Sequence, residues 1–209
     1  MKRLFSLLLT SLLAVGNLSA QTDTKSTTLV ASANGKDFLF NYYQQTFNAL
    51  QKSVEGLSET QLNFKPAADR WSVRQCLEHI VLTEKIIFDF AKKGMEAPAN
   101  PERKKDLKMQ DEDVFKGITD RSFKAKAPES IVLTGKYLNA DAALTDLKIN
   151  RKAVFKYIDS VSLDDLRNHI SDSPIGLIDA YQEFVFLAGH TSRHTAQIEE
   201  VKADVNFPK

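Results

Sequence analysis

Apolar residues recur every three or four positions along four long segments, and this spacing constrains the fold more than any other feature of the sequence. In the first segment, residues 36–57, the recurring residues are Phe38, Leu39, Tyr42, Tyr43, Phe47, Leu50 and Val54. A period near 3.6 residues places such side chains along one face of an α-helix. Similar stripes begin at Ser72 and after Asn139, and another runs from about Asp179 to Ala203. We therefore predict four long amphipathic helices that share one core.

Capping residues mark where helices begin. Ser58 is followed by Gln61, and Ser72 is followed by Gln75. This three-residue spacing is typical of a capping box, in which the two side chains satisfy backbone amides at the start of a helix. The first pair predicts a short helical turn, and the second predicts the start of the second long helix, which runs to about Lys93.

The segment between the second and third long helices is irregular. Residues 94–138 contain Pro98, Pro101 and several charged clusters, with a pattern for one short helix near Asp111 to Arg121. We interpret this segment as a long crossover connection. Four long helices with one long crossover predict an all-α four-helix bundle.

The first twenty residues have the pattern of a secretory signal peptide. Lys2 and Arg3 precede a mainly apolar stretch, and small residues around Ala20 resemble a cleavage site. The stretch is shorter than the roughly 20 apolar residues that a membrane span needs, so no stable membrane insertion is expected after cleavage. We predict an exported protein, periplasmic or secreted, in which residues 21–35 form a flexible leader and residues 36–209 form the folded domain.

Charge and cysteine content exclude several classes of function. The chain carries 28 Lys and Arg against 27 Asp and Glu, a formal net charge of +1, so it lacks the strong positive field of nucleic-acid-binding proteins. The basic run Arg103-Lys104-Lys105 is short enough to be a solvated loop. A single cysteine excludes an internal disulfide and any zinc site built from two or four cysteines. Nucleic acid is therefore not an expected partner.

Three of the four histidines fall on predicted inward faces. His190 and His194 are four residues apart in the fourth helix, so their imidazoles share one face about one turn apart. His79 lies on the apolar stripe of the second helix. Two helices of a bundle can deliver three imidazoles to one point, and three neutral nitrogens leave coordination positions open on a metal ion.

A simpler interpretation of these histidines is that each is a core residue bonded to a backbone carbonyl. A four-residue histidine pair also arises by chance. Three inward imidazoles favour a metal more strongly, because every buried ring nitrogen needs a partner and one ion partners all three rings. The pattern alone leaves both interpretations open.

Two segments resemble the DinB/YfiT-like superfamily in the order in which that family carries them. Residues Trp71 to Ile80 read WSVRQCLEHI, and residues Gly189 to Ile198 read GHTSRHTAQI. The first resembles the Trp-Ser pair and histidine that open the second helix of the family. The second resembles its His-x-x-x-His-x-x-Gln-Ile segment in the fourth helix. The resemblance extends over residues 38–201.

This resemblance implies a four-helix bundle that holds a divalent metal ion through His79, His190 and His194. Metals in such proteins include zinc, nickel, manganese and iron, so the resemblance leaves the identity of the metal open. Members include metal-dependent hydrolases and thiol-dependent transferases or isomerases. Dimers are common among them, so a homodimer is one expectation.

Several residues near the histidines are further candidates. Glu183 lies seven residues before His190 on nearly the same helix face, so it is a candidate fourth ligand or general base; we favour a solvated or ion-paired carboxylate. Gln197 is a candidate to orient a metal ligand. Cys76 is a candidate thiolate ligand, although a single buried cysteine usually only packs.

The remaining candidates have simpler interpretations. Arg193 can clamp an anionic substrate, but its helix position turns it about 100° from His194, so we expect a surface ion pair. His169, in the connector before the fourth helix, is a weak catalytic candidate at a pocket mouth, and we favour exposure. Trp71 and Tyr42 are expected to be core or rim aromatics, and Glu78 to face away from its neighbour in sequence, His79.

These observations lead to three functional hypotheses. The first is an exported metal-dependent enzyme of hydrolase type that activates water for attack on a small-molecule substrate. The second is a thiol-dependent S-transferase or isomerase, which export disfavours because small thiols are chiefly cytosolic reductants. The third is a non-catalytic metal- or ligand-binding module. A fourth protein ligand such as Glu183 or Cys76 would favour the third hypothesis, and an open coordination position would favour catalysis.

Overall fold

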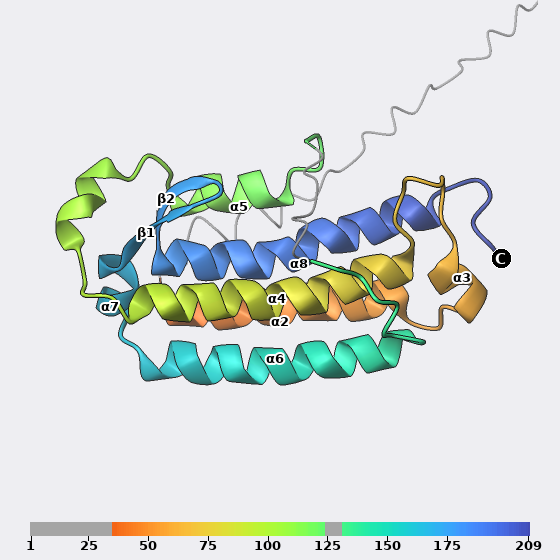
Figure 1. The fold of residues 1–209 in the computed structure, drawn as a ribbon, viewed down its shortest axis with the longest axis horizontal. Helices are drawn as coiled ribbons and strands as arrows, with labels where there is room; N and C mark the ends of the chain where they lie inside the picture. The colour runs from red at the N-terminus through yellow and green to blue at the C-terminus, as the bar shows by residue number, and fades with distance from the viewer. Residues whose placement is uncertain (1–34, 124–130) are drawn as a thin grey trace, which may run out of the picture.

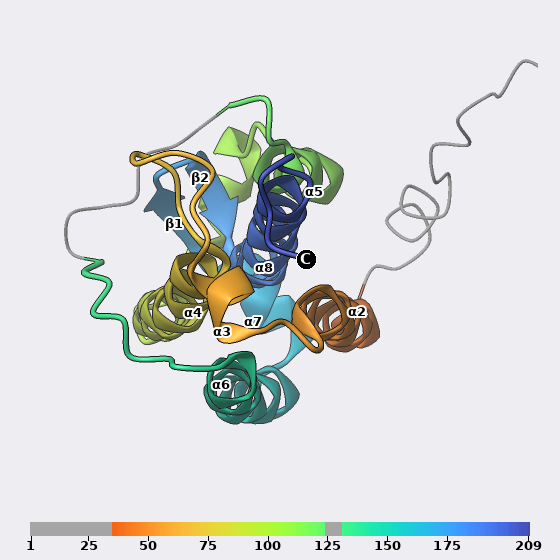
Figure 2. The same ribbon diagram turned by 90° about the vertical axis from the view of Figure 1, so that its right-hand side faces the viewer.

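A computed structural model describes residues 35–123 and 131–209, and four long helices in these ranges form an elongated bundle (Figure 1). Seen end-on, they occupy the four corners of the bundle (Figure 2). Neighbouring corners pack against each other. The helices are α2 (Lys36–Val54), α4 (Val73–Met95), α6 (Ala140–Ser160) and α8 (Ala180–Lys202). The predicted all-α four-helix bundle is confirmed.

The direction of the helices explains the long connection. The colour gradient in Figure 1 shows that α2 and α8 run one way along the bundle while α4 and α6 run the other way. Since α4 and α6 are consecutive in the bundle and parallel, the chain between them must return along the whole bundle. This crossover contains the 3₁₀ helix η1 (Pro101–Asp106) and helix α5 (Asp111–Thr119), and α5 lies on the outer side of α8 (Figure 2). Both the crossover and its short helix are confirmed.

Local capping fixes the starts of the helices. Ser58 and Ser72 accept hydrogen bonds from the backbone amides of Gln61 (3.3 Å) and Gln75 (3.2 Å), and each glutamine accepts one in return. These capping boxes open α3 (Glu59–Asn63) and α4. Asn139 caps α6 by accepting from the amide of Ala142 at 2.9 Å.

One side of α4 departs from the predicted pattern. Phe90, at a position that the three- and four-residue spacing of the apolar stripe turns toward the bundle, is 48% exposed, whereas Glu78 and Glu84 are almost fully buried. The carboxylate of Glu78 accepts hydrogen bonds from Thr134 and from the backbone amide of Gly135, at 2.8 and 2.9 Å. A helix face that is polar in sequence is therefore covered by the chain that leads into α6. Periodicity predicts the face turned to the bundle but not the face that a crossover covers.

The connector before α8 contains strands that periodicity did not predict. Helix α7 (Leu163–Asn168) leads into an antiparallel hairpin of β1 (Ile170–Ser173) and β2 (Gly176–Asp179). Gly176 has a positive φ of 117°, which a residue with a side chain rarely adopts. Asp179 ends β2 and caps α8 by accepting from the amide of Gln182 at 2.8 Å. The hairpin thus delivers the chain directly into the helix that carries two histidines.

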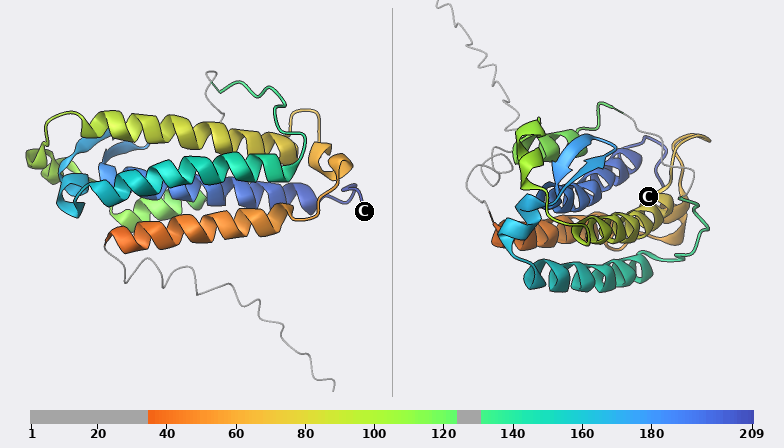
Figure 3. Two further views of the ribbon diagram at one scale, coloured as in Figure 1. Left: turned by 90° about the horizontal axis from the view of Figure 1, so that it is seen from below. Right: turned by 60° about the vertical axis from the view of Figure 1, so that its left-hand side comes forward.

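A buried ion pair connects α6 to the other three bundle helices. Helix α6 lies beside α2 and α4 (Figure 3). Its Arg151 contacts both carboxylate oxygens of Glu84 on α4, each at 3.2 Å. It also donates to the backbone carbonyl of Tyr43 on α2 and to the hydroxyl of Thr191 on α8, the latter at 2.9 Å. Arg151 and Glu84 are 3% and 1% exposed. The pair therefore lies in the core with its donors satisfied.

The predicted signal peptide, residues 1–20, and all of the predicted leader except Gly35 lie outside the described residues. No helix within 35–123 and 131–209 has the length and hydrophobicity that crossing a membrane requires.

Candidate metal centre

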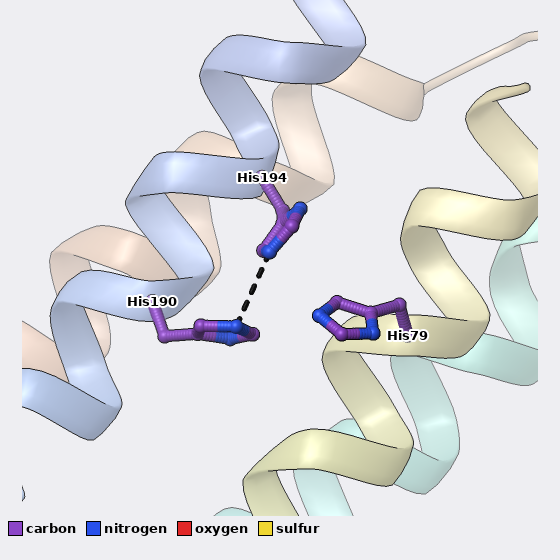
Figure 4. Close-up of side chains that lie close together, drawn as sticks. All are labelled: His79, His190 and His194. Carbon is purple, nitrogen blue, oxygen red and sulfur yellow. Dashed lines mark hydrogen bonds between the residues drawn. The ribbon is translucent and has the colours of Figure 1, made fainter. Parts of the chain in front are cut away.

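Two bundle helices position the three histidines. The Ser72–Gln75 capping box fixes the start of α4, and His79 follows in its second turn. His190 and His194 lie one turn apart in the middle of α8, which packs against α4 along the bundle. All three rings point into the space between the two helices (Figure 4). The prediction that helix geometry brings these residues together is confirmed.

The ligand atoms of the histidines converge. One ring nitrogen from each of the three lies within 4.8 Å of the others. The Nε2 atoms of His190 and His194 are 3.2 Å apart (Figure 4). Two nitrogens bound at 2.0–2.1 Å to one tetrahedral ion lie about 3.3 Å from each other. The helical pair is therefore spaced as two ligands of one ion, and the donor set suits a divalent transition metal.

Burial keeps the three imidazoles neutral. The exposed fractions of His79, His190 and His194 are all below a tenth. Loss of hydration lowers the pKa of His79 to about 4. Burial and the neighbouring rings lower the pKa of His194 to about 3 and hold that of His190 well below its ordinary value. Neutral imidazole is the form that binds metal ions, so the three rings are ready to do so at neutral pH.

Side chains around the triad fix the orientation of its rings. The Trp71 indole lies over two rings, with centroids 4.8 Å from that of His79 and 6.0 Å from that of His194. The hydroxyl of Thr83, one turn after His79, lies 3.3 Å from His79 Nδ1. His194 Nδ1 donates to the amide oxygen of Gln197 at 2.9 Å. Since that oxygen only accepts, Nδ1 of His194 carries the proton, and Nε2 has a lone pair that can bind a metal ion.

Two candidate ligands lie outside the cluster. Within residues 35–123 and 131–209, neither Glu183 nor Cys76 joins the group formed by the three histidines. Cys76 packs in the apolar core, where burial raises its pKa to about 12 and keeps the thiol protonated. Glu183 is 5% exposed, and burial raises its pKa to about 7. Of the two environments expected for the Glu183 carboxylate, solvated or ion-paired, the solvated one is therefore wrong.

Three other candidate residues contact the backbone or the apolar core rather than the triad. His169 lies at the end of α7, away from the triad, with its ring nitrogens 2.7 Å and 3.1 Å from the backbone carbonyls of Asp165 and Ala97. Tyr42 is a core aromatic whose hydroxyl faces Gly189, as expected for a core or rim residue. Glu78 does face away from His79, but into the backbone of residues 134–136 rather than into solvent.

The prediction for Arg193 is wrong. Instead of a surface ion pair, its side chain is 9% exposed and donates to the backbone carbonyls of Ile118, Asp120 and Phe123. These carbonyls belong to the last turn of α5 and the residues after it. Helix periodicity did turn the side chain away from His194, but α5 covers that face of α8.

Sequence reasoning missed two sets of residues around the centre. The first is the buried Arg151–Glu84 pair, whose partner Thr191 is adjacent to His190 in α8. The second is Arg121, which reaches Gln197 and Glu200 of α8 from the crossover. Both involve partners at least 40 residues apart in sequence, and no local pattern marks such pairs.

Most of the sequence that forms the bundle and its histidine cluster matches the sequence model of a protein family. Residues 42–198, which include all three histidines, match the model of the DinB superfamily. The chain belongs to the DinB superfamily. It is similar to the uncharacterized protein YuaE of Bacillus subtilis (strain 168), at 28% identity over 163 residues that cover 77% of this chain and 93% of YuaE.

The bundle is also similar to the solved structure of YfiT from Bacillus subtilis. The match has a TM-score of 0.57 at 14% identity and covers 83% of this chain and 89% of YfiT. YfiT is described as a probable metal-dependent hydrolase with an unusual four-helix bundle topology. At this level of identity the similarity shows the shared fold.

Proposed function

We propose that this chain is a metal-dependent enzyme of hydrolase type, with a divalent transition metal ion held by His79, His190 and His194. The observation that carries the proposal is the convergence of three buried, neutral imidazoles within 4.8 Å. Three separately satisfied core histidines would not need their nitrogens to meet at one point. Zinc, nickel, manganese and iron all suit such a donor set.

The absence of a fourth ligand from the cluster supports catalysis over a structural role. Among the described residues, the cluster offers three neutral nitrogens and no carboxylate or thiolate. Structural zinc sites are usually closed by four protein ligands, whereas catalytic sites keep a position for water or substrate. A divalent ion in such a site supplies Lewis acidity, which lowers the pKa of a coordinated water and polarises a substrate oxygen.

The protein's own residues would orient the ligands and limit access to the centre. Gln197 holds His194 in the tautomer that presents Nε2, and the Trp71 indole covers the edge of the site formed by His79 and His194. Glu183 does not suit the role of general base at the ion. It lies seven positions before His190 along α8, a rise of about 10 Å.

Export belongs to the same proposal. The pattern of residues 1–20 supports cleavage near Ala20 and release of the protein into the periplasm or the medium. An oxidising compartment favours hydrolysis over a reaction that consumes a small thiol.

The deciding experiment measures metal content by elemental mass spectrometry on protein purified without a histidine tag. We expect about one transition metal ion per chain, lost in His79→Ala and in His190→Ala but kept in the matched control His169→Ala, which removes a histidine outside the cluster. Metal content unchanged in all three variants would refute the site.

Catalysis is tested separately with the metal-loaded protein. A panel of chromogenic esters, amides and phosphoesters tests hydrolysis, and a small thiol with an electrophile tests S-transfer. Turnover that His190→Ala abolishes would support an enzyme. A stoichiometric metal without turnover in either assay would instead support a non-catalytic metal-binding module.

A further inference from the structure

A chain of polar contacts runs outward from one of the three histidines to the crossover. The Gln197 amide oxygen that accepts from His194 Nδ1 also lies 3.4 Å from Nη1 of Arg121. Arg121 in turn donates from Nε and Nη2 to the two carboxylate oxygens of Glu200, at 2.9 and 2.8 Å. The guanidinium therefore faces Gln197 and Glu200, one turn of α8 apart, with three of its nitrogens.

The two ends of a glutamine amide have nearly the same shape but opposite hydrogen-bonding roles. If the amide turned over, its NH₂ group would face both Arg121 Nη1 and His194 Nδ1. An NH₂ group facing the guanidinium places donor against donor. Arg121 therefore favours the orientation in which the oxygen of Gln197 faces the imidazole.

The orientation of this amide decides which nitrogen of His194 carries the proton. With the oxygen facing Nδ1, the proton stays on Nδ1 and Nε2 has a free lone pair. With NH₂ facing it, Nδ1 would have to accept, and the proton would move to Nε2. Since Nε2 is the atom 3.2 Å from Nε2 of His190, a proton there would block the ligand position.

The backbone that carries Arg121 is itself held against α8. Arg193, next to His194, donates to the carbonyls of Ile118, Asp120 and Phe123, on both sides of Arg121. Two arginines thus connect α8 and the crossover in opposite directions. Arg193 of α8 bonds to the crossover, and Arg121 of the crossover bonds to α8. This double attachment gives Arg121 a defined position although it lies at the edge of the bundle.

We infer that Arg121 is a positioning residue of the metal centre: it holds the Gln197 amide so that His194 presents Nε2 to a metal ion. This inference rests on the proposed metal site. On this inference the crossover contributes to metal affinity through Arg121, although the three ligands themselves lie on α4 and α8.

The charge of Arg121 and its positioning role predict opposite effects on metal affinity when the arginine is removed. A guanidinium near the centre repels a divalent cation, so removing it would strengthen metal binding if charge were its whole contribution. A positioning role predicts weaker binding. Loss of a residue that orients a metal ligand typically costs 10–100-fold in affinity; Arg121 acts one contact further out, so we expect Arg121→Met to weaken zinc binding by about 3–10-fold.

The matched control and a rescue variant separate positioning from general damage. Arg70→Met removes another arginine that contacts Glu200, at 3.6 Å, and leaves the contact between Arg121 and Gln197 in place, so its zinc affinity should equal that of wild type. Gln197→Glu in the Arg121→Met background should restore the affinity, because a carboxylate accepts from Nδ1 through either oxygen and needs no arginine to orient it.

Zinc affinity is measured by competition with a chromogenic chelator on the full-length mature protein. The tautomer of His194 is measured independently by long-range ¹H–¹⁵N NMR on chelator-treated protein, which requires neither metal nor activity. Wild type should show a protonated Nδ1, and Arg121→Met should show a mixture of tautomers.

Three outcomes would overturn the inference. These are unchanged or tighter zinc binding in Arg121→Met, failure of Gln197→Glu to rescue weakened binding, and an unchanged His194 tautomer. If the wild-type protein binds no metal, the proposed function fails, and the tautomer measurement still decides the role of Arg121 toward His194.

Discussion

The buried Arg151–Glu84 pair allows a quantitative prediction. Arg151→Met leaves Glu84, which is 1% exposed, without its cationic partner. The Tyr43 carbonyl loses less, since it also accepts from the hydroxyl of Thr46 at 3.0 Å. Removing one member of a buried ion pair costs about 3–5 kcal/mol because a charge is left uncompensated. A domain with about 5–15 kcal/mol of total stability would lose a large part of it.

Replacing both members should cost much less than replacing one. The double variant Glu84→Met/Arg151→Met puts two apolar side chains of similar length in the core, and such replacements are often neutral or stabilising. We expect its free energy of unfolding to lie within about 2 kcal/mol of the wild-type value. The double-mutant cycle therefore predicts a coupling free energy of several kcal/mol between the two positions.

The cost of Arg151→Met should also depend on pH. Burial raises the pKa of Glu84 to about 7 even though Arg151 opposes the shift, and removing the arginine raises it further. Between the unfolded pKa near 4.5 and this value, the folded state binds a proton that the unfolded state lacks, so stability falls as pH rises. The variant should be less destabilised at pH 5 than at pH 8.

Urea denaturation of chelator-treated protein, followed by circular dichroism at both pH values, measures these quantities. The control Lys152→Met changes the adjacent residue of α6, which is exposed, and should stay within about 0.5 kcal/mol of wild type. A loss below about 1 kcal/mol in Arg151→Met, or a double variant as unstable as the sum of the single variants, would refute the reasoning.

Three further predictions concern other parts of the chain. A Cβ at Gly189 would lie 2.5 Å from Cγ2 of Ile118 in α5. Gly189→Ala should therefore lower the free energy of unfolding, measured by urea denaturation, by about 1–3 kcal/mol, although alanine has the better helix propensity. A stabilised variant would mean that α5 can move away from the new methyl group without cost. Burial raises the pKa of Glu183 to about 7, so the free energy of unfolding falls as pH rises from about 4.5 to 7. Glu183→Gln should therefore raise the free energy of unfolding by about 1–3 kcal/mol at pH 8 and change it little at pH 4.5. An equal gain at both pH values would contradict this. Mass spectrometry of protein exported by its host should find an N-terminus near residue 21, and an intact Met1 would contradict the signal-peptide prediction.

Much of the fold follows from local pattern. The four helices, their capping boxes and the crossover all have signals within a few residues of the chain, because helix hydrogen bonds and caps join neighbours in sequence. The i, i+4 spacing of His190 and His194 belongs to the same class of information. The hairpin between β1 and β2 was missed because its strands are four residues long and lack a clear alternation of apolar and polar residues.

The sequence by itself therefore determined the bundle and the helix faces that carry the three histidines. Only the tertiary structure decided which side chains surround them: the burial of Arg193 under α5, the reach of Arg121 to Gln197, and the exclusion of Glu183 and Cys76 from the cluster. The physical reason is that helix periodicity fixes the direction of a side chain from its own axis. What that side chain meets depends on how distant segments pack, and the free energy of that packing is shared among residues far apart in the sequence.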